Sequence, residues 1–119
     1  GKDMTLNEIR LQAALHHSNI TEYKEAFVSI FGGYVCLVME YCDGGDLQAA
    51  ITDKVNNKKY FKEKEIWNIF IQIVRGLHKM HESSVNHRDI KSANIFLKLD
   101  GTVKIGDFSA ARYSSDGIL

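Results

Sequence analysis

An amphipathic stretch over residues 63–82 constrains the fold more than any other part of the sequence. Its apolar side chains recur every three or four residues, which is the period of an α-helix. They are Ile66, Ile69, Phe70, Ile73, Val74, Leu77 and Met80. Acidic residues near its start and basic residues near its end suit the helix dipole. Because such a stripe must be buried against other elements, the sequence predicts a helix that packs into the core of a domain.

The composition is that of an ordinary globular domain, with 45% hydrophobic and 25% charged residues. Lysine plus arginine total 15 and aspartate plus glutamate total 15, so the formal net charge is zero. Without a basic field to hold phosphates, no nucleic-acid partner is expected. No apolar run approaches the roughly 18 residues of a membrane span, and the apolar face of 63–82 is interpreted as core, so no membrane partner is expected.

The N-terminus and the cysteines indicate a cytoplasmic location. Residues 1–4 lack the apolar core of a signal peptide. The chain has two cysteines, Cys36 and Cys42, which are interpreted as free thiols in a reducing compartment. The first residue is Gly1 rather than methionine, which favours a piece of a longer protein.

Shorter elements are predicted on both sides of the central helix. They are a helix over residues 5–17, strands over 27–30 and 34–39, a short helix over 46–54, and strands over 94–99 and 102–105. Thr5 is expected to cap the first helix. The uniformly apolar run 35–39 is typical of a strand that is buried on both faces. Gly32-Gly33 and Asp100-Gly101 each predict a hairpin turn.

Side chains suited to phosphate chemistry gather around the second predicted hairpin. Asn94 opens its first strand and Asp107 follows its second strand. Because a hairpin brings its two ends together, these side chains are expected to lie close to each other. An amide oxygen and a carboxylate are ligands that suit Mg²⁺.

Two more residues of this kind, Asp89 and Lys91, lie on the loop before the hairpin. Asp89 can orient a hydroxyl nucleophile and take up its proton. Lys91 can reach a transferring phosphoryl group as a point charge. Positioning, metal bridging and charge neutralisation are the requirements of phosphoryl transfer, so the pattern predicts an enzyme of that class.

The same residues closely resemble the catalytic loop and metal loop of eukaryotic protein kinases. The matching motifs are His87-Arg88-Asp89 with Asn94, followed by Asp107-Phe108. The amino-acid sequence of residues 38–47, together with that of 91–97, is most similar to the NIMA-related Ser/Thr kinases. Lys91 stands where the resemblance implies Ser/Thr rather than Tyr substrates.

The resemblance implies a partial kinase fold of the α+β class. It would comprise the end of the N-lobe with helix C and two to three antiparallel strands, the hinge, and the start of the helical C-lobe with the catalytic-loop hairpin. The expected boundaries are 1–39 for the N-lobe portion, 40–46 for the hinge and 47–119 for the C-lobe portion. The Gly-rich loop and the third-strand lysine of the family have no counterpart here, so the 119 residues alone are not expected to catalyse.

The resemblance also implies roles around the reacting phosphate. Asp89 would orient and deprotonate the substrate hydroxyl, and Lys91 would offset charge on the transferring group. Asn94, with Asp107, would hold Mg²⁺ on the phosphates of ATP. His87 is interpreted as a structural residue packed near Phe108.

On the nucleotide side, the resemblance implies a binding site for the adenine of ATP. Met39 would stand at the gatekeeper position, and the backbones of Glu40 and Cys42 would hydrogen-bond the base. Phe96 would help to form the floor, and Glu8 would be the glutamate of helix C.

Partners and location follow from the same resemblance. A protein with Ser or Thr hydroxyls is the expected substrate, and a regulatory protein is a further expected partner. Nuclear or cytoskeletal association, in place of a purely cytoplasmic location, would follow by family analogy alone.

The alternative is a non-catalytic, pseudokinase-like interaction module or a degenerate kinase fragment. Two departures from the family pattern favour it, besides the missing loop and lysine. Ser109 replaces the glycine of the metal loop, which is expected to restrict the backbone there. Gln12 replaces an apolar residue one turn after Glu8, so its side chain must find a partner or face water.

Overall fold

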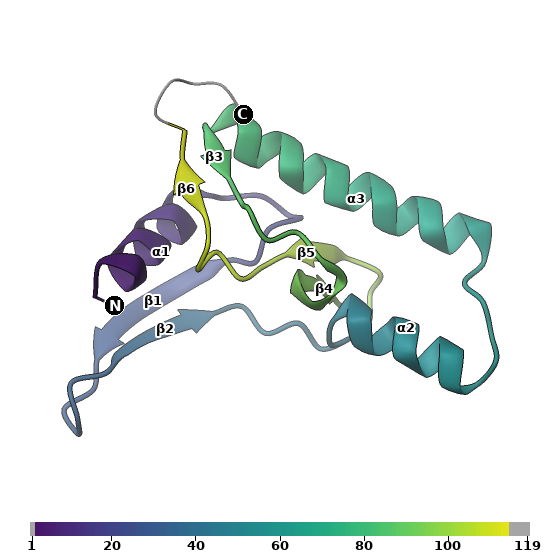
Figure 1. Ribbon diagram of the computed structural model, residues 1–119, viewed down its shortest axis with the longest axis horizontal. Helices are drawn as coiled ribbons and strands as arrows, with labels where there is room; N and C mark the ends of the chain where they lie inside the picture. The colour runs from purple at the N-terminus through teal and green to yellow at the C-terminus, as the bar shows by residue number, and fades with distance from the viewer. Residues whose placement is uncertain (1, 115–119) are drawn as a thin grey trace.

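The computed structural model describes residues 2–114, with side chains from residue 6 onward (Figure 1). The helices are α1 (Lys2–Ala14), α2 (Leu47–Asn56), α3 (Glu63–Glu82) and the short 3₁₀-helix η1 (Ser92–Asn94). The strands are β1 (Tyr23–Val28), β2 (Val35–Met39), β3 (Val85–Asn86), β4 (Ile95–Leu97), β5 (Val103–Ile105) and β6 (Arg112–Tyr113). The sheets within the described residues are antiparallel pairs, β1 with β2, β3 with β6 and β4 with β5.

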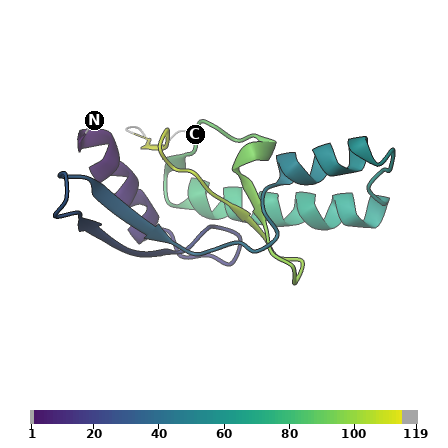
Figure 2. The same ribbon diagram turned by 90° about the horizontal axis from the view of Figure 1, so that it is seen from below.

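Two parts of a flat molecule meet at the β4–β5 hairpin. Helix α1 and the β1–β2 hairpin form one part, and helices α2 and α3 form the other (Figures 1 and 2). The molecule measures 45 × 39 × 21 Å along its principal axes. The chain passes from the first part to the second through residues 40–46, beside β4.

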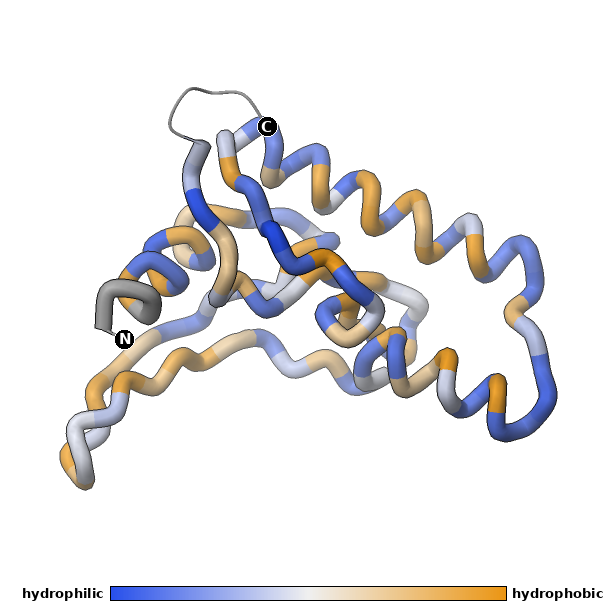
Figure 3. The backbone as a smooth tube through the Cα atoms, viewed as in Figure 1, coloured by the Kyte–Doolittle hydropathy of each residue, from blue (hydrophilic) through white to orange (hydrophobic). Residues whose placement is uncertain are grey.

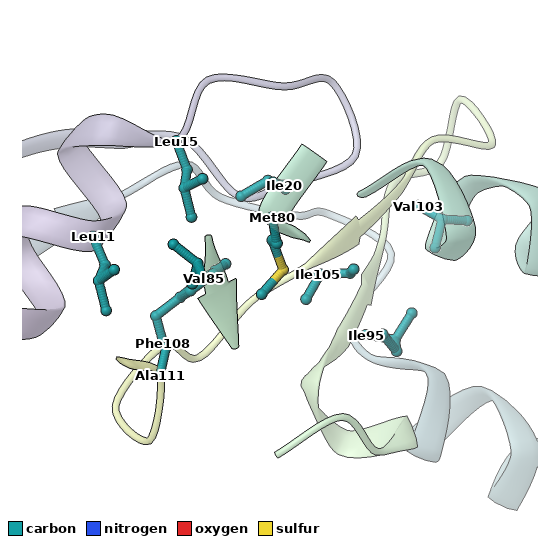
Figure 4. Close-up of a cluster of buried hydrophobic side chains, with 10 residues drawn as sticks. All are labelled: Leu11, Leu15, Ile20, Met80, Val85, Ile95, Val103, Ile105, Phe108 and Ala111. Atoms are coloured by element: carbon teal, nitrogen blue, oxygen red, sulfur yellow. The ribbon is translucent and has the colours of Figure 1, made fainter. Parts of the chain in front are cut away.

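A cluster of buried hydrophobic side chains joins the two parts (Figure 4). Its members come from α1, the end of α3, strands β3 to β5 and their connections. They are Leu11, Leu15, Ile20, Met80, Val85, Ile95, Val103, Ile105, Phe108 and Ala111. The core therefore lies around the β4–β5 hairpin and its flanking loops, which hold the candidate chemical residues in place.

Helix α3 has the predicted bounds, but only part of its apolar stripe is buried. Met80 is fully buried, whereas Ile66 and Phe70 are each 53% exposed. Figure 3 shows the apolar residues repeating along the whole helix. The described elements that pack most closely on α3 are β3 and β5, so within residues 2–114 the apolar face is covered at its Met80 end and partly uncovered at its Ile66 end. No helix in that range is long and apolar enough to cross a membrane.

Strand β2 is less buried than its apolar sequence predicts. Val35 is 41% exposed and the other strand residues are half-buried, so the prediction of a strand buried on both faces is wrong. The reason is that, within the described part of the chain, β2 pairs only with β1. The turn between them is as predicted: Gly32 and Gly33 have positive φ, and the Ser29 N–H donates to the Tyr34 carbonyl at 2.7 Å.

The first elements differ from the predicted boundaries. Helix α1 begins at Lys2 and ends at Ala14, so Thr5 lies inside the helix and is not its cap. Strand β1 begins at Tyr23 rather than residue 27 and ends at Val28. A polar start hid the strand, because alternation of apolar and polar residues is weak there.

The later elements are closer to prediction. Helix α2 continues to Asn56, beyond the predicted 54, and Asp46 caps it, accepting a 2.8 Å hydrogen bond from the Ala49 N–H. Strand β4 begins at Ile95, because Asn94 closes the turn of η1 with a 2.9 Å bond from its N–H to the Lys91 carbonyl. The hairpin turn at Asp100-Gly101 is confirmed, with φ of +93° at Gly101.

Candidate functional site

A pocket of about 370 Å³ lies where the α1/β1–β2 part meets the β4–β5 hairpin. Its lining joins α1, the end of β2, residues 40–46, β4 and the residue after Gly106. The lining residues are Glu8, Gln12, Thr21, Leu37, Met39, Glu40, Tyr41, Cys42, Gly45, Asp46, Phe96 and Asp107. All five residues predicted for nucleotide binding lie here together, and Asp107, one of the two predicted metal ligands, lies with them.

One end of the pocket is apolar. Leu37, Met39 and Phe96 supply its apolar surface. Gly106 leaves room for the Phe96 ring, because a Cβ at that glycine would lie 2.5 Å from the ring. A flat aromatic ligand suits such an apolar surface.

The backbone beside this apolar end offers a free acceptor and a free donor. No described residue hydrogen-bonds to the Glu40 carbonyl or the Cys42 N–H. The Glu40 N–H donates to the Glu22 carbonyl at 2.9 Å, and the Cys42 carbonyl accepts from the Gly45 N–H at 3.3 Å. Burial and then the nearby Glu40 charge raise the pKa of the Cys42 thiol, which therefore stays protonated at neutral pH.

The other end of the pocket is acidic. Glu8 from α1 and Asp107 both line it. Burial, and then the negative charge of Asp107, raise the pKa of Glu8. No lysine or arginine of the described residues forms an ion pair with Glu8. The electrostatics at this end therefore favour a cation.

Asp107 is held by its own loop. The residue has a positive φ of 52°, and its Oδ1 accepts hydrogen bonds from the Ser109 N–H at 3.2 Å and from the Ser109 hydroxyl at 2.7 Å. Ser109 itself does not adopt positive φ, so serine costs no backbone strain at this position. The positive φ in this loop falls on Asp107, and the expectation that Ser109 restricts other backbone conformations stays a prediction.

The loop before η1 is built around His87. Its ring is 3% exposed and lies 5.1 Å from the Phe108 ring, which confirms the structural interpretation. Nδ1 accepts from the Asp89 N–H at 3.1 Å, so Nε2 carries the proton and donates to the Gly106 carbonyl at 2.7 Å. This histidine therefore ties the Asp89 backbone to the residue that precedes Asp107. Arg88, at positive φ, donates from Nε to the Ala110 carbonyl at 2.7 Å.

Asn94 links Asp89 to the segment that carries Asp107. Its Nδ2 donates to the Asp89 carbonyl at 2.9 Å and to Asp89 Oδ2 at 3.1 Å. Its carbonyl accepts from the Gly106 N–H at 2.9 Å, beside Asp107. The predicted proximity of Asn94 and Asp107 is confirmed for their backbones, and the Asn94 side-chain oxygen remains available as a ligand. Lys91 Nζ lies 3.7 Å from Asp89 Oδ2, so the loop carries a cation beside the acid.

The donors present fit Mg²⁺. An amide oxygen and a carboxylate lie at one end of the hairpin, and this ion commonly takes one or two protein oxygens and completes its shell with water and phosphate oxygens. Residues 2–114 contain no group of three or more His, Cys, Asp or Glu side chains that could enclose a metal by themselves. The arrangement therefore suits an ion shared with a phosphate ligand.

Several positioning residues escaped the sequence interpretation. The buried amide of Asn19 and the half-buried amide of Gln72 bond β5: Asn19 donates to the Val103 carbonyl at 2.9 Å, and Gln72 Oε1 accepts from the Val103 N–H at 2.8 Å. Lys104 is buried at 7% exposure and pairs with Glu40 at 3.0 Å. Gln12 does find a partner, the Thr21 carbonyl at 3.5 Å. A polar residue inside an apolar run is the one sequence signal that singles out Lys104.

Comparison with known proteins gives a consistent family. A family model described as the protein kinase domain matches residues 1–118. Mouse serine/threonine-protein kinase Nek3 is 49% identical over 108 residues, which is 91% of this chain and 20% of that protein. Mouse Nek5 is 42% identical over 118 residues, covering 98% of this chain and 18% of that protein. Human Nek2 is 36% identical over 116 residues, covering 93% and 26%. The chain thus spans about a quarter or less of the length of these relatives.

Proposed function

The chain belongs to the protein kinase family, with NIMA-related Ser/Thr kinases among its relatives, and we propose that its protein transfers the γ-phosphoryl group of ATP to protein Ser and Thr hydroxyls. Its α+β architecture is that of a partial kinase fold. We assign residues 1–39 to the N-lobe, 40–46 to the hinge and 47–119 to the C-lobe. The observation that carries the proposal is the hydrogen bonding of Asn94 to Asp89, next to Asp107 on the neighbouring strand end.

The acidic end of the pocket is the proposed site of phosphoryl transfer. Asp89 accepts the proton of the substrate hydroxyl and orients its oxygen, while the Asn94 amide holds the carboxylate in place. Lys91, already beside Asp89, offsets negative charge on the transferring group. Asn94 and Asp107 hold Mg²⁺, which when bound neutralises charge on the phosphates.

The apolar end of the pocket is the proposed adenine site. The Glu40 carbonyl accepts from the base and the Cys42 N–H donates to it, since neither group has another partner among the described residues. Phe96 supplies the floor and Met39 closes the inner end. Glu8 faces the phosphate end, where a bound cation stabilises its carboxylate and so lowers its raised pKa.

Substrate and partner assignments are finer proposals. A protein with Ser or Thr acceptors is the substrate by relationship to the relatives, and a regulatory protein partner is proposed on the same ground. Neither nucleic acid nor membrane is proposed as a partner, since the chain has zero formal net charge. A cytoplasmic location is proposed, with nuclear or cytoskeletal association by family analogy.

A non-catalytic interaction module is the second candidate. Glu8 without a cationic partner among the described residues favours it. Nucleotide binding with no phosphoryl transfer by the full-length protein is the result that this alternative predicts.

The test is the substitution Asp89→Asn in the full-length protein. Turnover of a Ser/Thr protein substrate should fall by roughly 10²-fold or more, because the hydroxyl loses its base, while nucleotide affinity stays nearly unchanged. Asp53→Asn, on the exposed side of α2, is the matched control and should retain full activity. Near-normal turnover by Asp89→Asn contradicts the proposed role.

A further inference from the structure

The carboxylate of Glu40 lies in an ion-pair cluster that the proposed chemistry does not use. Oε1 accepts from Lys104 Nζ at 3.0 Å and from the Glu22 N–H at 3.0 Å, and Oε2 lies 3.4 Å from Lys98 Nζ. The Glu40 side chain is 13% exposed, and those of Lys104 and Lys98 are 9% and 30% exposed. This cluster joins the start of residues 40–46 to the residue after β4 and to the middle of β5.

Burial makes the partners depend on each other. An unpaired charge in such a position is strongly unfavourable, so removal of Glu40 leaves Lys104 without its ion-pair partner, and removal of Lys104 leaves Glu40 with only the more exposed Lys98. Lys24 and Glu22 form a contrasting pair at 3.8 Å with side chains 53% and 58% exposed. Exposed pairs of that kind contribute little.

The cluster fixes a backbone segment of the pocket. The Glu40 N–H donates to the Glu22 carbonyl at 2.9 Å, while the Glu22 N–H donates back to the Glu40 carboxylate at 3.0 Å. These reciprocal bonds hold residue 40 by both its main chain and its side chain. The same residue lines the pocket, and its carbonyl has no hydrogen-bond partner among residues 2–114.

The ion pair between Glu40 and Lys104 also connects residue 40 to the strand that leads to Asp107. Lys104 is the middle residue of β5, three positions before Asp107. Main-chain bonds hold this strand on both edges: β4 pairs with one edge, and on the other the Ile105 N–H donates to the Asn19 carbonyl at 2.9 Å while the Ile105 carbonyl accepts from the Thr21 N–H at 3.0 Å. A displacement of Glu40 is therefore opposed by a strand that is itself immobilised.

From this geometry we infer that Glu40 is a positioning residue for nucleotide recognition, acting through its side chain. Its pairing with Lys104, supported by Lys98, sets the distance between the base-binding backbone of residues 40–42 and the Asp107 end of the pocket. The inference rests on the proposed function, because it assumes that the pocket binds ATP. It assigns to the side chain a role separate from the hydrogen bond made by the Glu40 carbonyl.

The experiment compares Glu40→Gln, Lys104→Met and the double variant in the full-length protein. Nucleotide affinity is measured by calorimetry with a non-hydrolysable ATP analogue, and kcat and KM are measured with ATP and a protein substrate. Each single variant should weaken nucleotide binding and raise KM for ATP by about tenfold, with kcat and KM for the protein substrate within about threefold of wild type. The double variant should be no worse than the singles, because both remove one interaction.

Two further variants keep the result interpretable if the buried substitutions impair folding. Lys98→Met removes the more exposed member of the cluster and should weaken nucleotide binding by about threefold in a folded protein. Lys24→Met is the matched control at the exposed pair and should change nothing. Circular dichroism at the assay temperature identifies any variant that is unfolded. Such a variant is set aside, and the nucleotide affinity of Lys98→Met then tests the inference.

The outcomes separate the two proposals. Unchanged analogue affinity in folded Glu40→Gln and Lys98→Met overturns the inference while leaving the proposed function intact. A folded variant in which KM rises equally for ATP and for the protein substrate also overturns it, since the side chain then does not act specifically on the nucleotide site. A wild-type protein that binds no nucleotide overturns both.

Discussion

The two hairpins of this protein have opposite relations between sequence and burial. In β1–β2, the strand β2 is apolar throughout, yet Val35 is 41% exposed and its other residues are half-buried. In β4–β5, the strand β5 contains a lysine, yet all of its residues are at most 7% exposed. Apolar composition therefore does not determine which hairpin is buried.

The difference comes from what packs on each strand. Strand β5 contacts α3 and pairs with β4. It also accepts a bond from the Asn19 side-chain amide and donates main-chain N–H bonds to Gln72 Oε1 and to the Asn19 carbonyl. Strand β2 has only β1 beside it among the described residues. The more buried hairpin is the one whose ends carry Asn94 and Asp107, so the closer packing lies where the proposed chemistry needs a fixed geometry.

The largest predicted contrast is between two identical substitutions. Val103→Ala in β5 removes methyl groups that are 2% exposed and should lower the free energy of unfolding by about 2 kcal/mol. Val35→Ala in β2 acts at a 41% exposed residue and should cost less than about 1 kcal/mol. Urea denaturation of the two full-length variants measures both. Equal losses would mean that the hairpins do not differ in packing.

Contact between α3 and β5 gives the next prediction. A Cβ at Gly76 would lie 2.7 Å from the Asn19 carbonyl oxygen and 2.9 Å from Ile105 Cδ1. Gly76→Ala should therefore force the helix away from the hairpin and cost about 1–3 kcal/mol, despite the better helix propensity of alanine. Asn68→Ala, at an exposed position of the same helix, is the control and should be within about 0.5 kcal/mol of wild type. A stabilised Gly76→Ala variant would contradict the close packing.

These two hairpins also show how far the sequence alone can lead. Periodicity gave the bounds of α3, and the Asp100-Gly101 turn gave the β4–β5 hairpin, because both signals are local. The family motif placed the candidate residues at that hairpin. Burial of Lys104 could not be predicted, because it depends on Glu40, which lies 64 positions earlier in the chain.

Long-range pairing explains the other failures. Strand β3 pairs with β6 through Val85 and Tyr113, and no local pattern marks strands of two residues. The exposure of β2 was equally hidden, since it follows from the number of neighbouring strands rather than from its own residues.

The predicted effect of pH on stability is smaller, and it comes from the ion pair between Glu40 and Lys104 of the β4–β5 hairpin. Burial acts to raise the pKa of Glu40, but bonds from Lys104, the Glu22 backbone and Lys98 outweigh it and lower the pKa. Because the folded pKa lies below the unfolded value, the contribution of Glu40 to stability is complete above about pH 4.5 and is lost as the pH falls through the folded pKa. The free energy of unfolding, measured between about pH 3 and 7, should fall less steeply toward acid pH in Glu40→Gln than in the wild type. An identical acid slope in both proteins would contradict the ion pair.

The smallest predicted effect lies just beyond β5, where the chain returns to solvent. Ser109→Ala removes the 2.7 Å hydroxyl bond to Asp107 but keeps the N–H bond at 3.2 Å. Because one exposed hydrogen bond contributes about 1 kcal/mol or less, the affinity for Mg²⁺ with nucleotide should change by less than about fivefold. Calorimetric titration checks this, and a loss beyond about tenfold would show that serine is essential for holding Asp107.

Magnesium-dependent nucleotide binding tests most directly whether the buried hairpin brings a metal-binding pair to the end of the pocket. Affinity for a non-hydrolysable ATP analogue is measured with and without Mg²⁺ in the full-length wild type and in Asp107→Asn. Mg²⁺ should strengthen binding to the wild type, and this gain should disappear in Asp107→Asn while binding without metal is retained. The same gain from Mg²⁺ in both proteins would contradict the placement of the metal at Asp107.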